Sequence, residues 1–175
     1  SLGLKVVLVL AGIHLAIALQ VITNNLSHPA IINAAESEHA LFSYQFGAGE
    51  RLYGPMDVHV RELWYTPLTF QVTGWVAKWF GYDIRSIRAV MAVIGISAIV
   101  VLGMLTYRLS RSKALAFIAA ALLAGIDTKA WPWFINLDPN ALHVLCALIG
   151  VYLLVRDRSL SWPTVIFSTL AFFGS

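Results

Sequence analysis

The stretch SIRAVMAVIGISAIVVLGMLTYRL, residues 86–109, indicates the class of fold because it is long enough to cross a lipid bilayer as one helix. The hydrocarbon core of a bilayer is roughly 30 Å thick and needs about 20 helical residues. Four further apolar runs accompany it, at residues 2–22, 114–126, 141–155 and 162–173, of which the second and the last are short. The sequence therefore predicts an all-α polytopic membrane protein with about five transmembrane helices.

The composition agrees with a membrane protein. The chain is 59% hydrophobic and 12% charged, with a mean hydropathy of +0.76, and ordinary soluble domains are less apolar. Its formal net charge is only +3, which is too small to argue for a nucleic-acid partner. The single cysteine, Cys146, lies in an apolar run and predicts neither a disulfide framework nor a cysteine metal site. The chain begins without Met and ends inside an apolar run, so we expect residues 1–175 to form one transmembrane domain that is incomplete at its C-terminus.

Basic residues predict the orientation in the membrane, because cytoplasmic loops are enriched in Lys and Arg. If the helices alternate, the basic residues between and before them fall on one side. They are Lys5, Arg108, Arg111, Lys113, Arg156 and Arg158. Residues 23–85 then form a large first outer loop, which faces the periplasm, the cell exterior or the lumen, and residues 127–140 form a second one. We expect the protein to lie in the inner or plasma membrane.

Two interfacial helices are predicted inside the first outer loop. Residues 36–46 can form a helix that ends at Gly47 and Gly49, since glycine is the commonest helix terminator. Residues 68–80 carry apolar side chains at helical spacing, after Pro67 and before Gly81. Such a helix is expected to lie in the plane of the membrane interface.

The first of these helices carries two acids, Glu36 and Glu38. At 100° per residue they point about 200° apart, so they cannot both serve one site. On a helical wheel Glu38 lies among the large apolar side chains Leu41, Phe42 and Phe46, whereas Glu36 lies with His39 and Ser43. Burying a carboxylate is costly unless it is paired or used, so Glu38 is the stronger functional candidate. The alternative is that both acids are solvated and favour the helix N-terminus.

A further polar group follows in the same loop, where Asp57, His59 and Arg61 alternate with valines. In an extended segment these three side chains share one face. Asp and His together suggest a metal, but two candidate ligands are weak evidence for one. An ordinary solvated face is the other reading.

The order of these features resembles a known family. A helix is followed by an acidic outer loop, GERLYG at residues 49–54, YTPLTFQVTGWVAKWFG at 65–81, RSIRAVMAVIG at 85–95 and FINLDPNALHVLCALIGVYLL at 134–154. This order is similar to the N-terminal part of the integral-membrane glycosyltransferases of the GT-C fold. The branch of lipid A aminoarabinose transferases and protein O-mannosyltransferase-like enzymes is the most similar. The family often has Asp, or an Asp-Glu pair, where this chain has Glu-Ser-Glu-His.

The resemblance implies transfer of a sugar from a polyprenyl-phosphate-linked donor to an acceptor on the outer face. Such a reaction needs a carboxylate base and cations that stabilise charge on the phosphate. The base implied by the resemblance is Glu38, or else Glu36. Asp57 and Asp138 would orient the acceptor, and Arg61, Arg88 or Lys129 would contact the phosphate. The residues specify no cofactor and leave a divalent metal open, while the partners implied are the lipid-linked donor and membrane lipids.

Several of these residues also have a purely structural reading. Arg88, like Arg85, can extend along a helix end to reach water. Asp138, which precedes Pro139, is an ordinary helix start.

Two histidines in or near the apolar runs, His14 and His143, support an alternative function. A neutral imidazole could ligate haem or chlorophyll. The chain would then be a non-catalytic accessory subunit, with fixed partner subunits, in a bioenergetic or pigment-binding membrane complex on a GT-C-like scaffold. An interhelical hydrogen bond from His14 would explain its position equally well.

Overall fold

The computed structural model describes residues 2–28, 34–50, 67–130, 140–157 and 161–173, and these residues form helices without any strand. The predicted all-α class is therefore confirmed for this part of the chain. The helices are α1 (Leu2–Ser27), α2 (Ala34–Gly47), α3 (Pro67–Phe80), α4 (Ile84–Ser110), α5 (Lys113–Ala130), α6 (Asn140–Arg156) and α7 (Trp162–Phe173).

Two of the described helices, α1 and α4, are long and apolar enough to cross a membrane. They contain 26 and 27 residues, against the roughly 20 that a bilayer core requires. The other predicted spans also form helices, but α5, α6 and α7 contain 18, 17 and 12 residues. Five membrane spans thus stay a prediction.

The helix boundaries follow local sequence signals closely. α3 begins at Pro67 and ends at Phe80, and Gly81 after it has a φ of 97°, a conformation that glycine adopts without steric cost. α1 differs from its prediction, since it continues to Ser27 instead of ending at residue 22. The Thr23 hydroxyl donates to the Leu19 carbonyl at 2.9 Å, so this polar side chain is satisfied within the helix itself.

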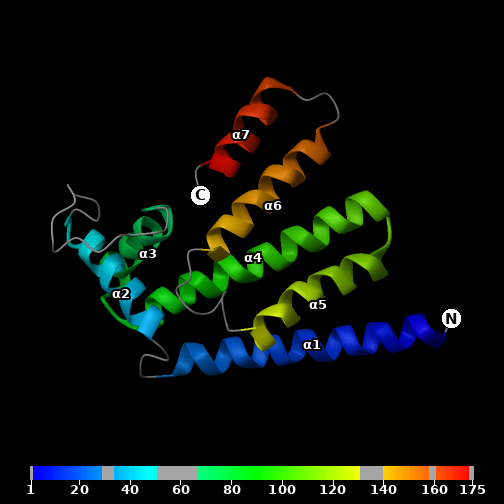
Figure 1. The fold of residues 1–175 in the computed structure, drawn as a ribbon, viewed down its shortest axis with the longest axis horizontal. Coiled ribbons are helices and arrows are strands. Elements are labelled where there is room, and N and C mark those ends of the chain that lie inside the picture. Colours follow the sequence, from blue (N-terminus) through cyan, green and yellow to red (C-terminus); the bar gives the residue numbers. More distant parts are fainter. Residues whose placement is uncertain (1, 29–33, 51–66, 131–139, 158–160, 174–175) are drawn as a thin grey trace.

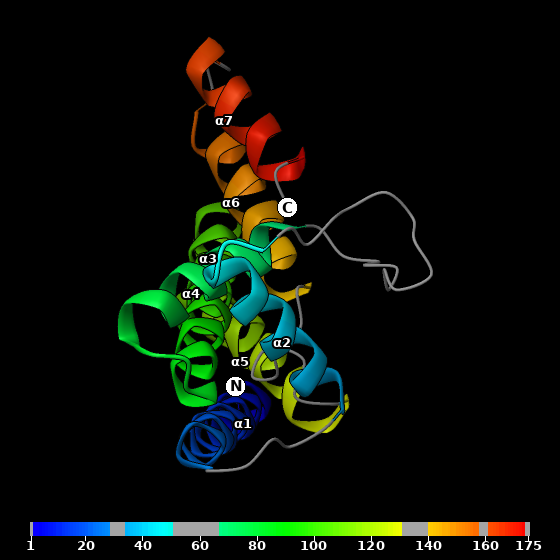
Figure 2. The ribbon, with the colours of Figure 1, turned by 90° about the vertical axis from the view of Figure 1, so that its left-hand side faces the viewer.

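The helices α1, α4 and α5 lie side by side, and α2 and α3 gather at one end of them. α5 packs against both α1 and α4, α4 packs against α6, and α6 packs against α7. α2 and α3 pack on each other near the end where α1 finishes and α4 begins, on the left of Figure 1. Figure 2, viewed from that side, shows α2 in front of the bundle.

A small apolar core holds α2 and α3 onto the bundle. Its buried members come from four helices, with Ala40 from α2, Ala77 from α3, Met91 from α4 and Leu142 from α6 among them. The core therefore fixes the position of α2, the helix that carries the two candidate acids, relative to the membrane-length helix α4.

Candidate functional site

The centre of the candidate site is an ion pair between Glu36 of α2 and Arg88 of α4. Arg88 Nε donates to Glu36 Oε1 at 2.6 Å and Arg88 Nη2 donates to Glu36 Oε2 at 2.8 Å. This is the bidentate arrangement in which a planar guanidinium matches a carboxylate. Both side chains are fully buried, with 0% of their surface exposed.

The same guanidinium also binds the end of α1. Arg88 Nη1 donates to the backbone carbonyls of Asn25 at 3.0 Å and His28 at 2.6 Å. The Asn25 carbonyl also accepts a hydrogen bond from the His28 backbone nitrogen at 3.2 Å, and His28 follows directly after α1, so Arg88 binds the turn that ends this helix. One side chain thus joins α1, α2 and α4.

This ion pair corrects two predictions about burial. On the helical wheel Glu38 was placed on the buried stripe, but Glu36 is buried and Glu38 is only half-buried. Arg88 was predicted either to contact phosphate or to reach water, yet it has no exposed surface. The sequence identified both residues as candidates, but it did not predict that they pair.

α2 meets α3 through the small polar side chains Ser43 and Thr73, as well as through aromatic contacts of Phe42 with Phe70 and of Phe46 with Trp75. Ser43 Oγ lies 2.7 Å from Thr73 Oγ1, and each hydroxyl also contacts the carbonyl one turn before it. Each hydroxyl has one proton to donate, so at most two of these three contacts are hydrogen bonds at any moment. A Cβ atom on Gly74 would lie 2.5 Å from the Ser43 carbonyl oxygen, so only glycine lets the two backbones approach this closely.

His39 lies on the buried face of α2, one turn after Glu36. Its ring contacts Phe70 of α3 edge-on, with ring centroids 5.6 Å apart, and only 7% of its surface is exposed. Burial lowers the pKa of His39 from 6.5 to about 4, against the opposing effect of the Glu38 carboxylate. His39 is therefore neutral at physiological pH.

This pKa predicts how stability depends on pH. Between pH 6.5 and 4 the unfolded chain binds a proton at His39 that the folded protein does not. The contribution of neutral His39 to the free energy of unfolding is therefore fully present above pH 6.5 and is lost as the pH falls toward 4. The expected loss is at most about 3 kcal/mol. His39→Gln should remove this component from a chemical unfolding series measured between pH 7 and 4, whereas the same change at the exposed His143 should leave it in place. Equal pH profiles for wild type and His39→Gln would contradict the assignment.

The remaining predicted site residues are only partly described. Asp57, Arg61 and Asp138 lie outside the described residues, and Lys129 belongs to the last turn of α5. Whether these four gather around Glu38 stays a prediction. Within the described ranges, no group of three or more His, Cys, Asp or Glu residues is placed to hold a metal ion.

The environment of His14 bears on the alternative function. His14 Nδ1 hydrogen-bonds to the Leu10 carbonyl of its own helix at 2.9 Å, so this bond is not the predicted interhelical one. The ring packs on α5, where a Cβ on Gly125 would lie 2.9 Å from His14 Cδ2. A cavity of about 140 Å³ adjoins the ring, which is below the roughly 300–1,000 Å³ typical of ligand pockets.

No family model matches the chain, and neither a curated protein nor a solved structure is significantly similar to it.

Proposed function

We propose that the protein is an integral-membrane glycosyltransferase that moves a sugar from a polyprenyl-phosphate-linked donor to an acceptor on the outer side of the membrane. The observation that carries the proposal is the fixed position of α2. This acidic helix is tied by the buried Glu36–Arg88 pair to the end of α1 and the beginning of α4, the two helices with the length to span a bilayer. Such a position suits a carboxylate that acts at the level of lipid headgroups.

Glu38 is the base in this proposal. It is half-buried, so the carboxylate is partly shielded and yet accessible, as proton transfer in a binding site requires. Glu36 is less suited, because both its oxygens accept hydrogen bonds from Arg88. Its role is to position α2, and Arg88 is thereby removed from the candidate phosphate ligands, which leaves Arg61 and Lys129.

In the proposed reaction the anomeric carbon of the sugar exchanges its bond to phosphate for a bond to the acceptor. The acceptor oxygen or nitrogen attacks the anomeric carbon of the sugar, and the bond from that carbon to the phosphate oxygen breaks. The electron pair stays on the polyprenyl phosphate, whose added charge the cations stabilise. Glu38 takes the proton that the acceptor loses.

The test is the loss of labelled sugar from polyprenyl-phosphate mannose and from polyprenyl-phosphate aminoarabinose, measured with the protein in its native membranes. Glu38→Gln is expected to lower the rate by roughly 10²–10⁴-fold, the usual contribution of a general base. Glu50→Gln is the matched control, because Glu50 follows α2 and is exposed. Equal rates for Glu38→Gln and wild type would remove Glu38 from the mechanism, and no turnover of either donor by the wild type would count against the proposed activity.

The accessory-subunit function receives no specific support from the described residues. The cavity at His14 is small, about 140 Å³, against the roughly 300–1,000 Å³ typical of ligand pockets. An absorption spectrum of the purified protein distinguishes the two functions, since a stoichiometric pigment would favour the accessory subunit.

A further inference from the structure

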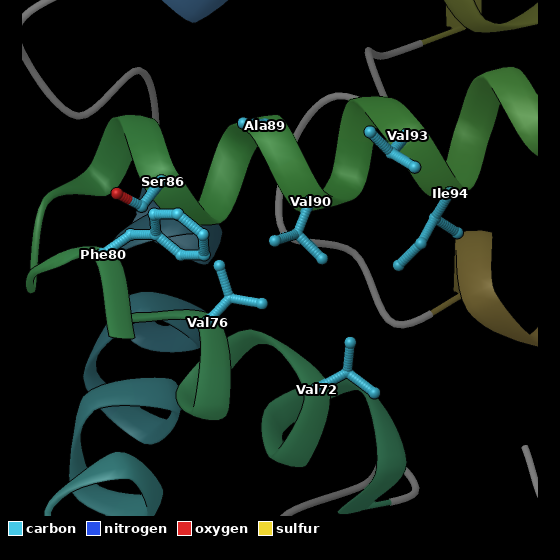
Figure 3. A pocket seen from close by; sticks show the side chains of 8 residues that line it. All are labelled: Val72, Val76, Phe80, Ser86, Ala89, Val90, Val93 and Ile94. Carbon is cyan, nitrogen blue, oxygen red and sulfur yellow. The ribbon is translucent and has the colours of Figure 1, made fainter. Parts of the chain in front are cut away.

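The two ends of α4 differ in the charge that surrounds them. Where α3 connects to α4, the surface between these helices is an apolar groove of about 550 Å³ (Figure 3). Of the described side chains that line this groove, only Ser86 is polar. At the opposite end, on the right of Figure 1, α4 finishes and α5 begins. The basic residues Arg108, Arg111 and Lys113 lie there.

Hydrogen bonds bring the end of α6, with a fourth basic residue, to the same place. Arg108 Nη2 donates to the Arg156 carbonyl at 2.8 Å, and Arg108 Nε donates to the Val155 carbonyl at 3.3 Å. Arg111 follows directly after α4, and Lys113 is the first residue of α5. The Cα atoms of these two residues are therefore at most about 7 Å apart. We call Arg108, Arg111, Lys113 and Arg156 the basic cluster.

The basic cluster is not paired with acids in the part of the chain that the structure describes. There, none of its four side chains forms an ion pair. The acid next to it in sequence, Asp157, accepts hydrogen bonds from the hydroxyls of Ser161 and Thr164 at 2.5 and 2.6 Å. The formal net charge of the chain is +3, so the four cations account for all of its excess positive charge. Such a local excess attracts an anionic partner.

The position of the basic cluster matches the depth of lipid phosphates. α4 contains 27 residues and is about 40 Å long at 1.5 Å per residue, whereas the hydrocarbon core of a bilayer is roughly 30 Å thick. A membrane-spanning α4 therefore ends among the headgroups. Apolar side chains beside the cations are also exposed, with Leu109 at 65% and Leu115 at 50%. Exposed apolar groups next to cations favour a lipid over a soluble acidic partner.

We infer that the basic cluster binds the phosphate of an anionic glycerophospholipid in the leaflet at this end, which the predicted orientation makes the cytoplasmic one. Arg111 and Lys113 are both exposed and close enough to bind one phosphate together. Arg108 is a positioning residue, because its guanidinium holds the end of α6 beside them. The inference rests on the proposed placement in a membrane but not on the proposed glycosyltransferase activity, which the sugar-transfer assay measures separately.

The test uses the full chain in phosphatidylcholine nanodiscs that contain a small fraction of phosphatidylglycerol with a photoreactive headgroup. Adducts are mapped by mass spectrometry, and we expect more of them at residues 107–115 than at residues 75–86. The double variant Arg111→Asn, Lys113→Gln should lower the yield at residues 107–115 by roughly tenfold or more, since each cation near an anionic surface contributes about fivefold. Asparagine is chosen because Arg111 has a φ of 57°, which asparagine tolerates.

The matched control is the double variant Lys78→Gln, Arg85→Gln. It removes two exposed cations near the other end of α4 and should leave the yield at residues 107–115 unchanged. Raising the salt concentration should lower that yield, because exposed charges are screened.

The remaining outcomes would each contradict part of the inference. Equal yields at the two ends, or from a phosphatidylcholine probe of the same design, would overturn the anionic lipid site. A wild-type yield from the double variant would remove Arg111 and Lys113 from it. Displacement of the probe by inorganic phosphate, beyond that by chloride at equal ionic strength, would show that the cluster takes a free anion instead of a lipid. Absence of adducts at both ends would contradict the membrane placement, whatever the sugar-transfer assay gives.

Discussion

Replacing Arg88 with leucine is expected to lower the free energy of unfolding by about 3–5 kcal/mol, the usual cost of removing one partner from a buried ion pair. The variant leaves the Glu36 carboxylate buried without the cation that now holds both its oxygens. It also removes the donor to the carbonyls at the end of α1. Denaturant titration of the solubilised protein measures the change.

Arg85→Leu is the matched control for this experiment. Arg85 lies one turn earlier on α4 and is exposed, so the same substitution there should change stability by less than about 1 kcal/mol. The double variant Glu36→Leu, Arg88→Leu should recover much of the loss, because hydrophobic residues often replace a buried pair without penalty. Similar losses for Arg85→Leu and Arg88→Leu would show that the pair does not contribute in the proposed way.

Gly74→Ala is expected to give the second large effect, a loss of about 2–3 kcal/mol from overpacking. The added methyl group would lie 2.5 Å from the Ser43 carbonyl oxygen and 3.1 Å from the Gly47 nitrogen. Both atoms belong to the backbone of α2, so no side chain can rotate away and the two helices must separate. Thermal unfolding of the solubilised protein would detect the loss.

Gly103→Ala provides the comparison for Gly74→Ala. Gly103 is also helical, but a Cβ there would be no closer than 3.6 Å to any neighbour, an ordinary contact. Alanine should therefore leave stability unchanged or raise it by up to about 1 kcal/mol, the difference in helix propensity. If both alanine variants were equally stable, the close approach of α2 and α3 would not be important for stability.

The helices could be predicted from the sequence because their signals are local. Pro67 and Gly81 mark the two ends of α3, and the apolar run at 86–109 lies inside α4. The buried face of α2 could not be predicted in this way. The wheel ranked large apolar side chains, but Leu41 is 49% exposed. Phe42 and Phe46 do contact α3, yet the fully buried positions of α2 include the polar Glu36 and Ser43.

The partners in the candidate site could not be predicted for a different reason. Glu36 and Arg88 are separated by 52 positions, and nothing in either local sequence specifies the other. The carbonyls of Asn25 and His28 carry no side-chain signal at all. By contrast, Glu38 could be selected as a candidate from its place among apolar side chains, and both acids from the resemblance to the glycosyltransferase family.

The Glu36–Arg88 pair also constrains the order in which the chain can mature during synthesis. α1 and α2 leave the ribosome before α4 exists, so the Glu36 carboxylate cannot form its ion pair until Arg88 has been synthesised. The contacts of the same guanidinium with the Asn25 and His28 carbonyls form only then as well. Docking of α2 through this pair therefore follows the synthesis of the first turns of α4, and a chain whose translation stops before residue 88 would have an acidic helix without the cation that holds it.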